Sequence, residues 1–106
     1  MNTPDKVCSI YADKGVRIRT GRIPGGLVLF EGDAEALEFV GKLFLAQARD
    51  QNSCADHLSP RGAGSALFTK NSSVGIYIHR LPCLEKNGGP IKVLRSKVKG
   101  KLSGRK

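Results

Sequence analysis

Residues 27–50 decide the fold that this sequence predicts, and they read LVLFEGDAEALEFVGKLFLAQARD. The first five are almost continuously apolar, which favours a central strand with both faces at least partly covered. After Asp33 the apolar period changes from two to 3.6, and the Asp33 carboxylate can cap a helix by accepting from its first amides. The side of this helix that we expect to face a sheet comprises Leu37, Val40 and Phe44, widened by Leu43 and Ala48. Gly41 interrupts the helix, and a close approach to the sheet is one reason for a glycine there.

Segments rich in β-branched and aromatic residues lie on both sides of this unit. Four of them predict strands, at residues 7–12, 16–20, 65–70 and 75–81. Turns are expected at residues 13–15 and 71–73, and irregular connections at 21–26 and 51–64. The resulting order is β-β-β-α-β-β. We therefore predict an α+β protein in which one helix packs on one face of a five-stranded, mostly antiparallel sheet.

One helix covers only one face of such a sheet. If Ile76 and Ile78 face the helix, Tyr77 and His79 point to the opposite face, because side chains alternate along a strand. The same alternation places Arg17 and Arg19 on that uncovered face. We expect the face to meet solvent, a second copy of the chain or a ligand.

The length of 106 residues allows one modest core, which we assign to residues 1–85 as a single domain. No apolar run approaches the roughly 18 residues of a membrane span, and the N-terminus lacks the pattern of a signal peptide. Three cysteines cannot all pair with one another, which fits a reducing compartment better than a disulfide scaffold. The sequence thus predicts a cytoplasmic protein.

The net charge of +9 is unevenly distributed along the chain. Residues 1–85 hold ten basic and nine acidic side chains, whereas residues 86–106 hold eight basic side chains and no acidic one. We expect residues 86–106 to form a disordered basic tail that can contact a polyanion or simply aid solubility. A nucleic-acid or partner interface would combine the uncovered face with the tail, through Arg17, Arg19, Tyr77, Lys92, Arg95, Lys97, Lys99, Lys101, Arg105 and Lys106.

The histidines and two of the cysteines have a spacing that suits a metal. Cys54 precedes His57 by three positions, and His79 precedes Cys83 by four. Zinc takes four nitrogen or sulfur ligands in tetrahedral geometry, and short chelate loops of this kind can supply them. The four residues are therefore a candidate zinc site. The alternative is that they are two unrelated thiols and two unrelated histidines, with no cofactor bound.

Catalytic patterns are weak in this chain. A cysteine and a histidine can act as nucleophile and base, and Asp56 beside His57 can orient an imidazole. The sequence contains no nucleophile elbow, phosphate loop or pair of carboxylates at a predicted cleft. We therefore predict that the protein works by binding and is not an enzyme.

The order of motifs over residues 27–81 resembles one known family. An apolar strand ends in EGDAEAL, a helix reads FVGKLFLAQA, and DHLSP, GSALF and VGIYI follow. This pattern is similar to the small bacterial immunity proteins of the family called immunity protein thirty-two. The resemblance covers about half of the chain and carries over no functional residue. It implies a non-enzymatic protein that binds and neutralises a toxin domain, although immunity proteins against nucleases are commonly acidic and this chain is basic.

Two functions are therefore expected. The first is binding of a protein partner, of immunity or adaptor type, with a homodimer through the uncovered sheet face as the simplest version. The second is non-specific binding of RNA or DNA through the basic tail and the arginine-bearing face.

Overall fold

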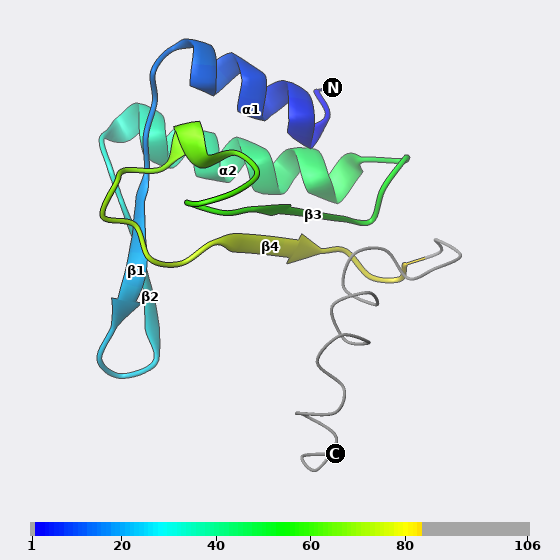
Figure 1. The fold of residues 1–106 in the computed structure, drawn as a ribbon. Helices are drawn as coiled ribbons and strands as arrows, with labels where there is room; N and C mark the ends of the chain where they lie inside the picture. The colour runs from blue at the N-terminus through cyan, green and yellow to red at the C-terminus, as the bar shows by residue number, and fades with distance from the viewer. Residues whose placement is uncertain (1, 84–106) are drawn as a thin grey trace.

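The computed structural model describes residues 2–83, which form two helices and two separate two-stranded antiparallel sheets (Figure 1). In chain order the elements are α1 (Pro4–Asp13), β1 (Arg19–Ile23), β2 (Leu27–Glu31), α2 (Ala34–Arg49), β3 (Ala55–Leu58), the short 3-10 helix η1 (Ser65–Leu67) and β4 (Ile76–His79). The predicted α+β class is confirmed, and the predicted single five-stranded sheet with one helix is wrong. The predicted tail, residues 86–106, lies outside the described residues.

Helix α1 stands where the sequence predicts the first strand. The hydroxyl of Thr3 accepts a hydrogen bond from the backbone N–H of Lys6 at 3.2 Å, and Pro4 lies in the first turn, where a missing N–H leaves no helical bond unmade. Val7 and Tyr11 are buried at helical spacing from Pro4. The β-branched and aromatic residues here favour a strand, but this cap and the burial of one helix side override that preference.

Helix α2 begins as predicted, with the Asp33 carboxylate accepting from the backbone N–H of Ala36 at 2.9 Å. The side predicted to face a sheet is only partly right. Leu43 is buried and Val40 packs against the core, whereas Leu37 and Phe44 are 47% and 46% exposed. No sheet covers that side among residues 2–83. A Cβ added at Gly41 would meet nothing within 4 Å, so a close approach does not explain the glycine. The side of α2 that faces the core consists of Ala36, Phe39, Leu43, Ala46 and Gln47.

Strands β1 and β2 form a hairpin in which Arg19 lies opposite Glu31 and Ile23 opposite Leu27. The bounds of β2 are those that the sequence predicts, whereas β1 continues through Gly21, where a loop was expected. The turn lies at residues 24–26 and contains two glycines with positive φ. The strand predicted to be central is thus one of only two strands in its sheet.

Strand β3 lies within the segment that the sequence predicts to be an irregular connection, and it pairs antiparallel with β4. Strand β4 confirms a strand within residues 75–81. Its predicted partner at residues 65–70 is not a strand, because η1 occupies that position. The predicted hairpin about residues 71–73 is therefore wrong, since the chain crosses from η1 to β4 without pairing the two.

The core lies between α1, α2 and the inward face of β3–β4 (Figure 1). Ile76 is 6% exposed and Ile78 packs against the core, so these two residues face the helices as predicted. Ile18 is fully buried and joins Phe68 by a parallel bridge, which ties the hairpin to the body. Neither helix combines the length and apolar character that a membrane crossing requires, and the same holds for all of residues 2–83.

Candidate functional site

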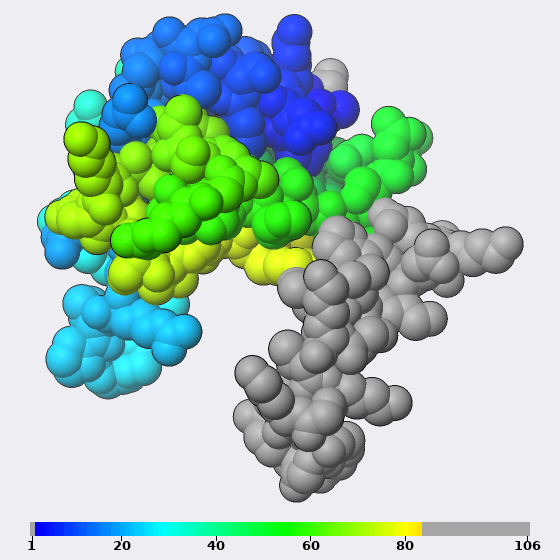
Figure 2. All heavy atoms as spheres, viewed as in Figure 1, coloured from blue at the N-terminus to red at the C-terminus, as the bar shows by residue number. Residues whose placement is uncertain are grey.

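The β1–β2 hairpin, residues 19–31, projects from the body as a separate lobe, and we call it the arm (Figures 1 and 2). Its base is fixed by a buried polar network. The hydroxyl of Ser72 accepts from the backbone N–H of Thr20 at 3.0 Å and donates to the carbonyl of Ile18 at 3.2 Å. The Thr20 hydroxyl in turn donates to the carbonyl of Val74. Thr20 and Ser72 are each 1% exposed, so these bonds hold the base of the arm in one position.

Beyond this base the arm exposes large apolar side chains on both faces. The pairing of Ile23 with Leu27 places these two on one face, and Val28 and Phe30 alternate to the other. Leu27 and Val28 are 57% and 53% exposed, and Ile23 and Phe30 are also exposed. Sequence reasoning missed the arm because it read the apolar residues of β2 as the sign of a buried strand. The available signal was the Pro-Gly-Gly turn between two short strands.

The outer side of α2 is a second exposed apolar surface. It carries Leu37 and Phe44, and Leu45 beside them is 52% exposed. Of the large hydrophobic residues that are exposed within residues 2–83, only Leu81 lies outside the arm and α2. Exposed apolar area is therefore concentrated on two neighbouring elements of the chain.

Three of the four predicted metal ligands meet in space. Cys54 precedes β3, His79 ends β4 opposite Ala55, and Cys83 follows four residues later. The two sulfur atoms and a ring nitrogen of His79 all lie within 4.8 Å of one another. Cys54 and Cys83 are joined in a disulfide, with their Cα atoms 5.6 Å apart.

His57, the fourth predicted ligand, does not belong to this cluster. It lies opposite Tyr77, and the two rings stack with their centroids 6.2 Å apart. Sequence spacing alone could not separate the two histidines, because the β3–β4 register decides which of them reaches the sulfur atoms. The disulfide runs against the argument from three cysteines, which favoured a reducing compartment over a disulfide scaffold. Two of the three pair and Cys8 stays free.

The predicted face of Arg17, Arg19 and Tyr77 does not form. Arg17 donates to the carbonyl of Ala66, and Arg19 forms a 2.8 Å ion pair with Glu31 at the base of the arm. Tyr77 lies on β4, in the other sheet. The three residues would share a face only if the two hairpins belonged to one sheet. The remaining predicted residues of this interface, Lys92, Arg95, Lys97, Lys99, Lys101, Arg105 and Lys106, lie outside the described residues.

A polar pocket of about 230 Å³ lies between the start of α1, the end of α2 and β3. Asp5, Asp50 and Asp56 line it together with Gln47. Burial raises the pKa of Asp56, and the negative charges of Asp5 and Asp50 add to this rise, whereas the backbone N–H of His57 opposes it. These carboxylates make the pocket unfavourable for an anion.

Two further side chains, Cys8 and Tyr11 of α1, have raised pKa values. Burial is the largest cause that raises the pKa of the Cys8 thiol to about 11, with the charges of Asp56 and Asp5 adding to it. The Tyr11 hydroxyl donates to the Glu38 carboxylate, and this bond raises the pKa of Tyr11 to about 12. A thiolate is the reactive form of cysteine, so neither group is suited to nucleophilic or acid–base chemistry near neutral pH.

Comparisons with known proteins found no match for this chain. No family model, no curated protein and no solved structure matches it. The resemblance to immunity protein thirty-two therefore stays a prediction.

Proposed function

We propose that this chain is a non-enzymatic binding protein whose arm docks into an apolar groove of a protein partner. One observation carries the proposal: the arm exposes Ile23 and Leu27 on one face and Val28 and Phe30 on the other. A two-stranded hairpin alone is at best marginally stable in water, so apolar side chains on both of its faces gain most when a second molecule covers them.

The anchored base makes the arm suitable for this role. The bonds between Thr20 and Ser72 hold the base, so the direction in which the arm leaves the body is fixed before a partner binds. Strand β2 pairs with β1 along one edge, and no strand within residues 2–83 pairs along its other edge. That edge can accept a partner strand, which adds main-chain hydrogen bonds to the apolar contact.

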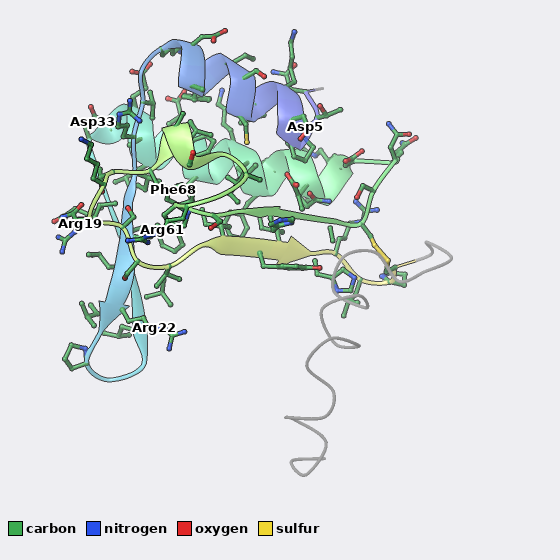
Figure 3. All side chains as sticks on the ribbon, in the orientation of Figure 1. Asp5, Arg19, Arg22, Asp33, Arg61 and Phe68 are labelled. Carbon is green, nitrogen blue, oxygen red and sulfur yellow. A yellow bond between two sulfur atoms is a disulfide. The ribbon has the colours of Figure 1, made fainter. Side chains whose placement is uncertain are left out.

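Charge favours a partner with an acidic rim. Arg22 lies on the projecting part of the arm, away from Arg19 and Arg61 near the base (Figure 3). Of the net charge of +9, residues 86–106 carry +8 and residues 1–85 only +1, so Arg22 is the charge that the arm itself offers. Complementary charge speeds the encounter of two proteins more than it strengthens the final complex. The proposed partner is therefore a protein with an apolar groove and acidic surroundings. The family resemblance implies a toxin domain as the partner, but it does not imply this charge.

The alternative function is non-specific nucleic-acid binding. It rests on the eight basic and no acidic side chains of residues 86–106. Each lysine or arginine that neutralises a phosphate adds affinity that falls with salt. The arginine-bearing sheet face no longer supports this function, because Arg17, Arg19 and Tyr77 are not gathered on one face.

The test compares two leucines of similar exposure on different elements. The full-length protein, Leu27→Asp on the arm and Leu45→Asp on α2 are each used to capture partners from nuclease-treated lysate of the cells that make the protein. Leu27 and Leu45 are 57% and 52% exposed, so neither change should prevent folding. We expect a protein that wild type and Leu45→Asp retain and that Leu27→Asp loses. Its affinity is then measured by calorimetry with the purified components.

Two results would contradict this proposal. Equal capture by Leu27→Asp and Leu45→Asp would show that the arm is not part of the contact. Capture that occurs in a parallel sample of untreated lysate and is lost after nuclease treatment would support the nucleic-acid alternative. Replacing Lys97, Lys99 and Lys101 by glutamine should then weaken binding while Leu27→Asp does not. Light scattering of the purified wild-type protein shows whether the partner is a second copy of the chain, as the predicted homodimer requires.

A further inference from the structure

The disulfide between Cys54 and Cys83 lies next to His79, so three side chains that can bind a metal are gathered at one place. All three ligand atoms lie within 4.8 Å of one another. Around a tetrahedral zinc ion with bonds of about 2.0–2.3 Å, neighbouring ligand atoms are separated by roughly 3.5–3.8 Å. Once the S–S bond is broken, the two sulfur atoms need to separate only modestly to reach that spacing with the imidazole in place.

We propose that the reduced protein binds one Zn²⁺ ion through Cys54, His79 and Cys83, with the fourth position open to water or another ligand. The disulfide and the metal are then alternative states of one site. A dithiol reductant breaks the S–S bond by supplying two electrons and two protons, and is itself oxidised to a disulfide. Zinc binding displaces the two thiol protons to solvent and leaves two thiolates and a neutral imidazole as ligands.

His79 provides a separate reason to infer a ligand. Its Nε2 atom is buried and has no hydrogen-bond partner among residues 2–83. Buried polar side-chain atoms are nearly always paired, and each exception calls for an explanation. With Nε2 as the ligating nitrogen, a metal held beside the two sulfur atoms would give this atom the partner that it lacks.

The surrounding backbone holds two of the three ligands, Cys54 and His79, next to each other. The backbone N–H of Arg80 donates to the carbonyl of Cys54 at 2.7 Å, which joins the residues next to His79 and β3. The Arg80 guanidinium donates to the carbonyls of Gln47 and Asp50 at 2.8 and 2.6 Å. The Arg80 side chain thus ties the residue after His79 to the segment that leads into Cys54.

His57 is excluded from this set for a geometric reason. It is two residues along β3 from Ala55, and its neighbour across the sheet is Tyr77. Its ring stacks on that tyrosine. His57 and His79 thus lie on the same small sheet, but only His79 is close to the two sulfur atoms. His57 can therefore serve as the control for His79.

The experiment titrates Co²⁺, as a spectroscopic stand-in for Zn²⁺, into the full-length protein. One sample is reduced with a phosphine and kept without oxygen, and the other keeps its disulfide. We expect the reduced protein to bind one Co²⁺ with an intense thiolate-to-cobalt absorption band, and Zn²⁺ to displace it. The oxidised protein should show no such band. The reduced protein should also release two protons per metal ion.

Variants then test the ligand set. His79→Ala should weaken Co²⁺ binding by at least about 100-fold, since even the loss of a hydrogen-bonded neighbour of a ligand costs 10–100-fold. His57→Ala and Cys8→Ser should leave the affinity unchanged. Absence of the thiolate band in the reduced wild type would overturn the proposal. An equal loss in the two histidine variants, or none in His79→Ala, would overturn the assigned ligands. The comparison of oxidised and reduced wild type needs no variant to fold.

Discussion

The orientation of α2 predicts very different costs for two identical substitutions on the same helix. Leu43 is 1% exposed in the core, whereas Leu37 is 47% exposed on the outer side. Leu43→Ala leaves a cavity and should lower the free energy of unfolding by roughly 2–5 kcal/mol. Leu37→Ala removes a side chain that water already reaches, so the loss should stay below about 1 kcal/mol. The change in helix propensity is the same for both.

Urea unfolding followed by circular dichroism measures both costs, with the disulfide kept intact in every sample. A domain of this size has a total stability of about 5–15 kcal/mol, so Leu43→Ala should remove a large fraction of it. The urea midpoint should fall markedly for Leu43→Ala and little for Leu37→Ala at an unchanged slope. Equal losses, or a larger loss for Leu37→Ala, would contradict this orientation of α2, because Leu37 would then have to be buried at least as fully as Leu43.

Further outcomes follow at single positions of the chain. Gly41→Ala should raise the free energy of unfolding by about 0.5–1 kcal/mol, because nothing lies within 4 Å of the new methyl group; a loss of stability in urea would show that this site is covered. Ser72→Ala should lower the free energy of unfolding by roughly 1–3 kcal/mol, because the buried N–H of Thr20 loses its acceptor. An unchanged free energy of unfolding would mean that the network does not hold the arm. Cys8, with a pKa near 11 instead of 9.0, should react with a thiol reagent about 100-fold more slowly at pH 8 in the folded than in the unfolded protein. Because folding raises the pKa of Cys8, the unfolded protein loses the thiol proton at a lower pH than the folded protein does. Below pH 9 the thiol is protonated in both states, so stability does not depend on it. Stability should then fall as the pH rises from 9 towards 11. Asp56→Asn should speed the reaction of Cys8 with the thiol reagent. An unchanged rate would show that the charge of Asp56 does not raise the pKa of Cys8.

Local signals of the sequence predicted α2 and β2 well. Asp33 forms the expected cap, and β2 has the expected bounds. These features depend on neighbours within a few residues. The side through which α2 packs was not predictable in the same way, because the helix has apolar residues on two sides and only the tertiary arrangement decides which of them is covered. Residues 7–12 show the converse case, in which strand-like side chains adopt a helix because Thr3 caps it and Val7 and Tyr11 are buried.

The candidate sites depended on pairing between distant segments, which the sequence does not contain in readable form. The spacing of cysteines and histidines pointed to a metal site and named the three side chains that meet. It could not reject His57, because that depends on the register in which β3 pairs with β4. The arm was missed because apolar residues in β2 indicate burial only if another layer covers them, and none within residues 2–83 does.

Hydrogen exchange of the arm, measured by mass spectrometry with and without the captured partner, tests most directly whether the arm is the contact surface. The amides of residues 27–31 should exchange more slowly in the complex, because the partner covers β2 and pairs with its open edge. The outer side of α2 should change less. Unchanged exchange in the arm, with protection confined to residues 86–106, would contradict the account and assign binding to the basic segment.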